Sequence, residues 1–159
     1  MRAHIYSLLF TAISAFASAI YAEEDVPVNE AREMCRESQD DGKIVECLEK
    51  GIYDPCDDAS GVHSSTTARC VFAHTEVANR RIQKAEKKIA AQLKKSGDKT
   101  GMKEFRNSQR KWRDYVKSYC EFAQHAVPEA SPFGSIGMCE RRHNEQRADE
   151  LEQFLASEE

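Results

Sequence analysis

The sequence has almost no segment in which apolar and polar residues alternate, and its β-branched residues are sparse. Alternation of that kind is the signal of a half-buried strand, so its absence argues against a fold built on sheets. Apolar residues instead recur at steps of three and four over long stretches, which is the spacing of one helix face. The sequence therefore predicts an all-α protein.

Sequence motifs of common enzymes and metal sites are also missing. There is no G-x-S-x-G, no H-E-x-x-H, no glycine-rich phosphate loop and no C-x-x-C pair. Glu121 and His125 are four residues apart, which would suit a base and its orienting carboxylate, but such pairs are more often solvated surface contacts. His63 and His74 flank a cysteine without the spacing of metal ligands. We therefore expect no enzyme, cofactor or metal site.

Long apolar runs are confined to the N-terminus. Residues 1–22 combine Arg2, a short apolar core and small residues up to Ala22, and three acids follow directly. This pattern is typical of a secretory signal peptide, cleaved after Ala19 or Ala22, and it is too short to span a bilayer. No cysteine directly follows the apolar core to accept a lipid anchor. We expect a periplasmic or secreted protein without membrane insertion.

The chain that remains after cleavage carries a small excess of acids. Residues 23–159 hold 27 Asp and Glu against 22 Lys and Arg, a formal net charge of −5. Nonspecific nucleic-acid binding needs a cationic face, so this balance argues against it. An acidic protein suits a cationic protein partner, although many exported proteins are equally acidic. The charge runs at residues 84–95 and 141–143 are typical of exposed helix faces.

Cysteines are the most informative residues that the sequence does contain. There are six of them, Cys35, Cys47, Cys56, Cys70, Cys120 and Cys139. An even number in an exported chain indicates three disulfides rather than a metal site. Six cysteines allow about 15 pairings, of which sequence proximity favours Cys35–Cys47, Cys56–Cys70 and Cys120–Cys139. On the chain-entropy model, loops of these lengths stabilise a fold by about 3 kcal/mol each.

Two long helices are expected to form most of the protein. An alanine-rich apolar seam extends over residues 71–93, and a second seam with large aromatic residues extends over residues 102–126. The break at residues 96–101 is short, so the helices should lie antiparallel. The aromatic positions expected over the alanine-rich stripe are Phe105, Trp112 and Tyr119.

Shorter helices are expected on either side of this pair. Val28–Gly51 predicts a small helical hairpin whose arms are joined by Cys35 and Cys47. Pro128 should end the second long helix, residues 129–137 should form a loop, and a last helix should begin near Met138. The expected division is a signal peptide over 1–22, a hairpin extension over 23–53 and the main helical domain over 54–159.

One stretch of the second long helix resembles a known family. Ser108-Gln109-Arg110-Lys111-Trp112, followed by Tyr115 and Cys120, is similar to the A-Q-R-x-W-x-x-Y-R-x-x-x-C element of LprI-like lysozyme-inhibitor domains. The end of the chain, with Cys139, Asn144, Arg147 and Leu151, resembles the closing helix of that family. Gly134-Ser135-Ile136 resembles its Gly-Gly-Ser loop. The resemblance covers about residues 54–155 and implies a small exported helical domain that binds a lysozyme.

The segment before the last cysteine is the candidate binding site. Phe133, Gly134, Ser135 and Ile136 lie within the loop that a Cys120–Cys139 bridge would close. A rigid loop loses little entropy on entering an enzyme cleft, where Phe133 would supply an apolar tip and Ser135 a hydroxyl group. The alternative is a connecting loop with Phe133 folded onto the core. Trp112 is expected in the core, and Arg147 should either clamp this loop or bind a partner.

These expectations give one leading function and several alternatives. The leading hypothesis is an inhibitor that places the loop in the glycan cleft of a peptidoglycan-cleaving lysozyme. An immunity protein against a secreted cell-wall hydrolase is a close variant. A non-inhibitory interaction module that docks through the Cys35–Cys47 hairpin is the second class. An enzyme would require a deep pocket around Glu121 and His125. The expected partner is a protein.

Overall fold

The structure is a computed structural model that describes residues 28–59, 65–126 and 132–157, and for residues 132–135 it describes the backbone alone. No strand occurs within these residues, so the all-α expectation is confirmed for them. The predicted signal peptide, residues 1–22, lies outside the described residues. The helices are α1 (Val28–Arg36), α2 (Asp41–Glu49), α3 (Ser65–Ser96), α4 (Lys99–Ala126) and α5 (Pro132–Ala156).

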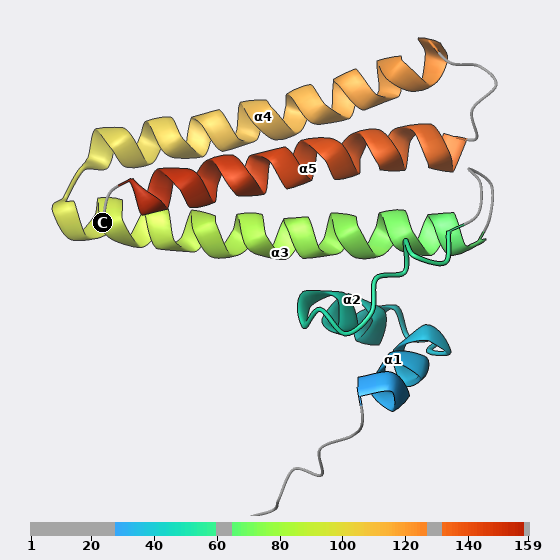
Figure 1. Cartoon of the computed structure of the whole chain (residues 1–159). Coiled ribbons are helices and arrows are strands. Elements are labelled where there is room, and N and C mark those ends of the chain that lie inside the picture. Colours follow the sequence, from blue (N-terminus) through green and yellow to red (C-terminus); the bar gives the residue numbers. More distant parts are fainter. Residues whose placement is uncertain (1–27, 60–64, 127–131, 158–159) are drawn as a thin grey trace, which may run out of the picture.

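The three long helices form an elongated bundle (Figure 1). The chain runs along α3, returns antiparallel along α4, and runs along α5 in the direction of α3. α5 lies between the other two in this view and packs most extensively on α3. None of the described helices combines the length and apolar character that a membrane span requires.

The turn between α3 and α4 is short because two local signals fix it. Gly97 has a φ of +73°, a left-handed conformation that glycine adopts without a Cβ clash and that commonly ends a helix. Asp98 then accepts a hydrogen bond from the Gly101 backbone N–H at 2.8 Å, which satisfies one of the free donors at the start of α4. The antiparallel arrangement of the two long helices follows directly.

The core of the bundle lies where small residues let α5 approach α3. Ile82, Ala85 and Ile89 of α3 form one buried cluster with Ala148 and Leu151 of α5. Phe105 and Trp112 of α4 pack against this cluster from the other side. Burial of each large aliphatic side chain contributes about 1.5–3 kcal/mol, so this cluster stabilises the packing of α5 on α3. The alanine-rich seam and the places of Phe105 and Trp112 agree with the sequence prediction.

The N-terminal hairpin packs on the first half of α3. Asp40 caps α2 through a 2.8 Å hydrogen bond from the Gly42 backbone N–H. Ile44 and Val45 of α2 are fully buried against Ala73 of α3. These apolar contacts attach the hairpin to the bundle.

Two expectations about the C-terminal half are wrong. The last helix begins at Pro132 rather than near Met138, so residues 132–137 of the predicted loop are helical. Proline is well tolerated at the first helical position because the N–H that it lacks would have no partner there. Tyr119 was expected over the alanine-rich stripe, but it is 44% exposed. Because α5 occupies the space beside α3, the last turns of α4 do not lie over that stripe.

Candidate functional site

The three disulfides match the pairing that sequence proximity favours. Their Cα–Cα separations are 6.1 Å for Cys35–Cys47, 4.7 Å for Cys56–Cys70 and 5.6 Å for Cys120–Cys139. The third joins the last turns of α4 to the first turns of α5, and Cys120 is completely buried there. This end of the bundle is therefore covalently fixed.

The predicted binding segment lies at this fixed end, but as part of a helix. Phe133, Gly134, Ser135 and Ile136 belong to the first turns of α5. One residue later, a Cβ atom at Gly137 would lie only 3.0 Å from Val71 Cγ1, so α5 approaches α3 closely at this point. The start of α5 is thus held by α3 on one side and by the Cys120–Cys139 bridge to α4 on the other.

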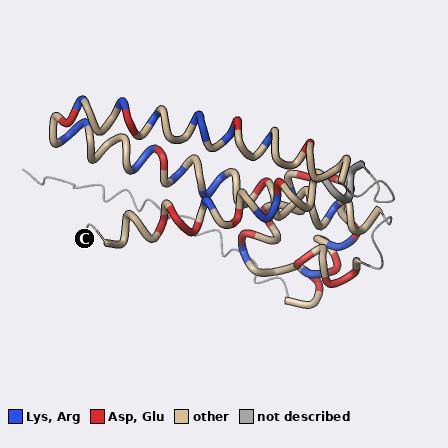
Figure 2. The backbone as a smooth tube through the Cα atoms, turned by 90° about the horizontal axis from the view of Figure 1, so that it is seen from above, with Lys and Arg blue, Asp and Glu red and all other residues tan. Residues whose placement is uncertain are grey.

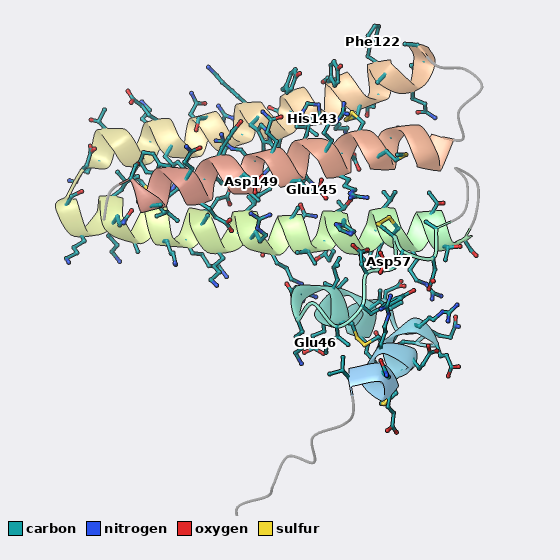
Figure 3. The ribbon with its side chains drawn as sticks, in the orientation of Figure 1. Glu46, Asp57, Phe122, His143, Glu145 and Asp149 are labelled. Atoms are coloured by element: carbon teal, nitrogen blue, oxygen red, sulfur yellow. A yellow bond between two sulfur atoms is a disulfide. The ribbon has the colours of Figure 1, made fainter. Side chains whose placement is uncertain are left out.

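Beside it, α4 carries a stripe of exposed aromatic side chains. Tyr115, Tyr119 and Phe122 are 51%, 44% and 66% exposed, and their spacing of four and three residues places them on one helix face. The rings of Tyr115 and Tyr119 stack with centroids 5.6 Å apart. His143 of α5 lies edge-on to both, at 5.7 and 5.3 Å. We call these four residues the aromatic stripe; Figure 3 labels Phe122 near the end of α4 and His143 on α5.

An exposed aromatic stripe of this kind is characteristic of an interaction surface. Single exposed apolar residues are ordinary, but contiguous ones on a small protein usually mark a contact with another molecule. Tyrosine is enriched at protein interfaces because its ring is rigid and apolar and its hydroxyl group can still bond. Tyr119 and Phe122 were not singled out as site residues from the sequence, because a helical spacing does not tell an outer face from an inner one.

The other residues of the family-like motif form a contact between α4 and α5. Arg147 Nε donates to Oε1 of Gln109, which is only 3% exposed, at 3.2 Å. The Arg147 guanidinium also pairs with Glu150 at 2.8 Å and lies 5.8 Å from the ring centre of Trp112. Arg147 therefore joins two helices. It lies ten residues beyond Gly137 in the same helix, about 15 Å along its axis, so its contacts are far from the segment that it was expected to clamp.

The motif thus divides into an inner part and an outer part. Gln109, Trp112 and Arg147 hold the helices together, whereas Arg110 is exposed and donates to Asn107 at 2.7 Å. Tyr115 belongs to the aromatic stripe. The buried Gln109 Nε2 has no hydrogen-bond partner among the described residues. A groove of about 350 Å³ lies beside it between α3 and α4, and a 2.6 Å ion pair between Glu86 and Arg113 bridges these helices there.

His74 sits at the junction between the hairpin extension and the bundle. Its Nε2 lies 3.0 Å from Asp54, and its Nδ1 lies 3.4 Å from Glu145 of α5. Burial raises the pKa of Asp54, but hydrogen bonds from the Cys56 backbone and from His74 outweigh it, so that pKa falls below its ordinary value. The Asp54 carboxylate is therefore charged at neutral pH and anchors the segment before α3.

Two groups of residues have the proximity of metal ligands, but their cysteines are already bonded. One is Asp54, Cys56 and His74, and the other is Cys120, Cys139 and His143. Both groups depend on disulfide sulfurs, which are not the thiolates that bind metal ions. Glu121 and His125 are both exposed on α4. His63 lies outside the described residues.

A known protein family matches most of the helical bundle. The family model described as "Lysozyme inhibitor LprI" matches residues 56–151. This span contains α3, α4, most of α5 and two of the three disulfides, and it leaves out the α1–α2 hairpin. No curated protein and no solved structure matches the chain. The chain belongs to the LprI family of lysozyme inhibitors.

Proposed function

We propose that this protein inhibits a peptidoglycan-cleaving lysozyme by binding it with the disulfide-fixed end of the bundle. The contact surface would comprise the aromatic stripe and the start of α5, from Phe133 to Ile136. We call this surface the inhibitory end. The observation that carries the proposal is the exposure of three large aromatic side chains at this end of a lysozyme-inhibitor family domain.

Rigidity makes this end suitable for blocking an enzyme. Binding costs free energy when loops and side chains must be ordered, and a preformed helical surface avoids most of that cost. The Cys120–Cys139 bridge and the close approach of Gly137 to Val71 hold the surface together before any partner binds. Inhibition would be steric, because a helix end placed at the glycan cleft excludes the substrate. Phe133 and Ser135 are proposed to contact the enzyme at that cleft.

The aromatic stripe supplies the apolar part of the proposed interface. Hot spots of protein interfaces are enriched in tyrosine and similar residues, and each costs about 2 kcal/mol or more when it is truncated. His143 packs edge-on against Tyr115 and Tyr119, and this packing limits the freedom of both rings. Pre-packed rings lose little side-chain entropy on binding.

Charge would assist the encounter with a cationic enzyme. Residues 28–59, which form the hairpin and its connection to α3, carry ten acids and four basic residues. The acids, drawn in red in Figure 2, include the labelled Glu46 and Asp57 of Figure 3. Complementary charge raises association rates more than it raises affinity, and salt weakens the effect.

Docking through the hairpin is the alternative that the exposed residues favour less. Val28 and Met34 of α1 are both exposed. They are six residues apart, so they point about 120° away from each other around the helix axis and share no single face. The aromatic stripe, in contrast, is continuous. An immunity protein would use the same surface on a different wall hydrolase.

The test is a wall-lysis assay with several lysozymes, using the oxidised protein and matched variants. We expect Tyr115→Ala/Tyr119→Ala/Phe122→Ala to weaken inhibition by at least about 100-fold, since each residue is a candidate hot spot. Phe133→Ala and Ser135→Ala test the start of α5. The control is Met34→Ala/Phe154→Ala, which removes exposed apolar side chains from the hairpin and from the opposite end of the bundle and should change inhibition by less than about twofold. Failure to inhibit any lysozyme would refute the function, and full inhibition by the triple variant would refute this surface.

A further inference from the structure

Charge is strongly separated along the molecule, although the whole chain is close to balanced. Residues 28–59 have a formal net charge of −6, whereas residues 65–157, with 18 basic and 12 acidic residues, have a net charge of +6. In Figure 2 the blue segments of Lys and Arg follow α3 and α4 up to their connecting turn. The net charges of these two parts cancel in the net charge of the whole sequence.

The positive charge is concentrated where α3 turns into α4. We call Lys94, Lys95, Lys99, Lys103 and Arg106 the basic tip; all five are exposed. Ion pairs neutralise five other cations of the described bundle, namely Arg80, Arg81, Arg113, Arg141 and Arg147. In the part of the chain that the structure describes, no carboxylate oxygen lies within 4.0 Å of a side-chain nitrogen of these five residues. The basic tip is thus available to an anionic partner.

Helix stability does not explain all of these cations. Lys94 and Lys95 lie in the last turn of α3, where positive charge is favourable because of the helix dipole. Lys99 lies in the first turn of α4, where the same dipole disfavours positive charge, and the carboxylate of Asp98 is the acid that caps this helix end. Positions that violate a local preference without an evident structural gain are expected at functional sites.

An apolar groove opens beside these lysines. Phe154 of α5 is half-exposed, and it forms a groove of about 450 Å³ with Ile89 and Leu93 of α3. Lys95 lies on the rim of the same groove. The nearby acids of α5 are engaged, since Glu152 pairs with Arg81 and Glu150 pairs with Arg147. A cationic side chain beside an exposed phenylalanine, here Lys95 beside Phe154, is a combination by which peripheral proteins bind the interface of an anionic bilayer.

We propose that the basic tip docks this protein on the surface of an anionic phospholipid bilayer, with the lysines at the headgroup phosphates and Phe154 in the interfacial region. The apolar groove favours a bilayer over a polyanion such as a nucleic acid, which would use the charges alone. This surface is independent of the proposed inhibition, because the inhibitory end lies at the other end of α4. The 28 residues of α4 span about 42 Å, so a docked molecule would present that end away from the membrane.

Co-sedimentation with lipid vesicles at low salt tests the proposal, using the oxidised protein without residues 1–22. One set of vesicles contains phosphatidylcholine alone, and in the other set about one third of the lipid is phosphatidylglycerol. We expect binding to the anionic vesicles and not to the neutral ones. Each lysine near an anionic surface contributes about fivefold in affinity, so Lys94→Gln/Lys95→Gln/Lys99→Gln/Lys103→Gln should weaken binding by at least about 100-fold. Phe154→Ser should weaken it by about fivefold.

A charge-matched control separates this site from a general effect of net charge. Lys43→Gln/Lys50→Gln/Lys111→Gln/Lys117→Gln removes the same charge from exposed positions away from the tip and should bind within about threefold of the original protein. The tip variant should melt close to the temperature of the original protein, because losing the favourable contacts of Lys94 and Lys95 with the α3 dipole offsets the relief of the unfavourable contact at Lys99. Equal losses in both variants, no vesicle binding, or tighter binding to a DNA duplex than to the vesicles would each overturn the proposal.

Discussion

Replacing Arg147 with methionine should destabilise the bundle without changing its binding surface. The guanidinium donates to the buried Gln109 Oε1, pairs with Glu150 and lies over the Trp112 ring. A hydrogen bond from a charged group contributes about 1.5–3 kcal/mol, and a cation–π contact near the surface contributes about 0.5–1 kcal/mol. The Glu150 pair adds little, because that carboxylate is half-exposed. Methionine keeps most of the apolar stem of the arginine side chain. We therefore expect Arg147→Met to lower the free energy of unfolding by about 2–3 kcal/mol.

A double-mutant cycle identifies the partner responsible for this loss. Gln109→Met removes the acceptor of the Arg147 hydrogen bond together with the unpaired Nε2 group. If the two side chains stabilise the fold by contacting each other, the effects of the two substitutions should not add. The destabilisation of the double variant should be about 1–2 kcal/mol smaller than the sum of the destabilisations of the single variants. Arg110→Met is the matched control, because Arg110 is exposed and bonds only to its helix neighbour Asn107 among the described residues; it should change stability by less than about 0.5 kcal/mol.

Urea denaturation followed by circular dichroism gives these free energies, and the wall-lysis assay gives inhibition with the same samples. A stable Arg147→Met variant, with additive effects in the cycle, would contradict the assignment of Arg147 and Gln109 to the scaffold. An Arg147→Met variant that keeps its stability but loses inhibition would instead make Arg147 a binding residue.

Three further predictions concern other parts of the fold. Cys120→Ala/Cys139→Ala should lower the free energy of unfolding by about 3 kcal/mol, since the bridge closes a loop with a sequence separation of 19; an unchanged denaturation midpoint would contradict this. The hydrogen bond from Arg81 lowers the pKa of Glu152, so this pair stabilises the fold above the ordinary glutamate pKa of about 4.5 and ceases to do so as pH falls further. The stability difference between the original protein and Glu152→Gln should therefore be at most about 1 kcal/mol at pH 7 and should shrink as the pH falls below 4.5; a pH-independent difference would refute it. Burial and the hydrogen bond to Asp58 raise the pKa of Tyr53 from 10.0 to about 12. The contribution of this tyrosine to stability is therefore complete below pH 10 and is lost as pH rises through 12. Absorbance at 295 nm should show one tyrosine that titrates later than the others, and this step should be missing in Tyr53→Phe.

The scaffold was largely predictable because its signals are local. The apolar seams of α3 and α4 follow the helical period, and Gly97 and Asp98 mark the turn between them. The short sequence separations of the cysteine pairs indicated the three bridges. Trp112 was correctly expected in the core, because a large aromatic residue on an apolar seam is more often packed than exposed.

The start of α5 was not predicted, because glycine and proline close together are typical of loops. The sequence has Ser131 directly before Pro132, which is a common helix start, and yet Pro132, Gly134 and Gly137 together indicated a loop. Gly137 has a packing reason instead, since a Cβ there would crowd Val71. Distinguishing these readings requires knowledge of how closely α5 approaches α3.

The candidate site was predictable only in part, because exposure depends on tertiary packing. Tyr119 continues the seam on which Trp112 packs against the core, yet it is 44% exposed and its ring contacts Tyr115 and His143 instead. Arg147 was recognised as significant, but its contact with Gln109 joins residues 38 positions apart in the chain. The charge separation was likewise hidden, because opposite charges on the hairpin and the bundle cancel in the net value.

Hydroxyl-radical footprinting of the complex with an inhibited lysozyme tests the central claim most directly. Radicals oxidise exposed aromatic and sulfur-containing side chains, and mass spectrometry locates the products. The proposed inhibitory end predicts that oxidation of Tyr115, Tyr119 and Phe122 falls by at least about fivefold in the complex, because exposed hot-spot side chains become desolvated. Met34 on the hairpin and Phe154 at the opposite end should be oxidised as in the free protein. Protection of Met34 with an unchanged aromatic stripe would contradict the account.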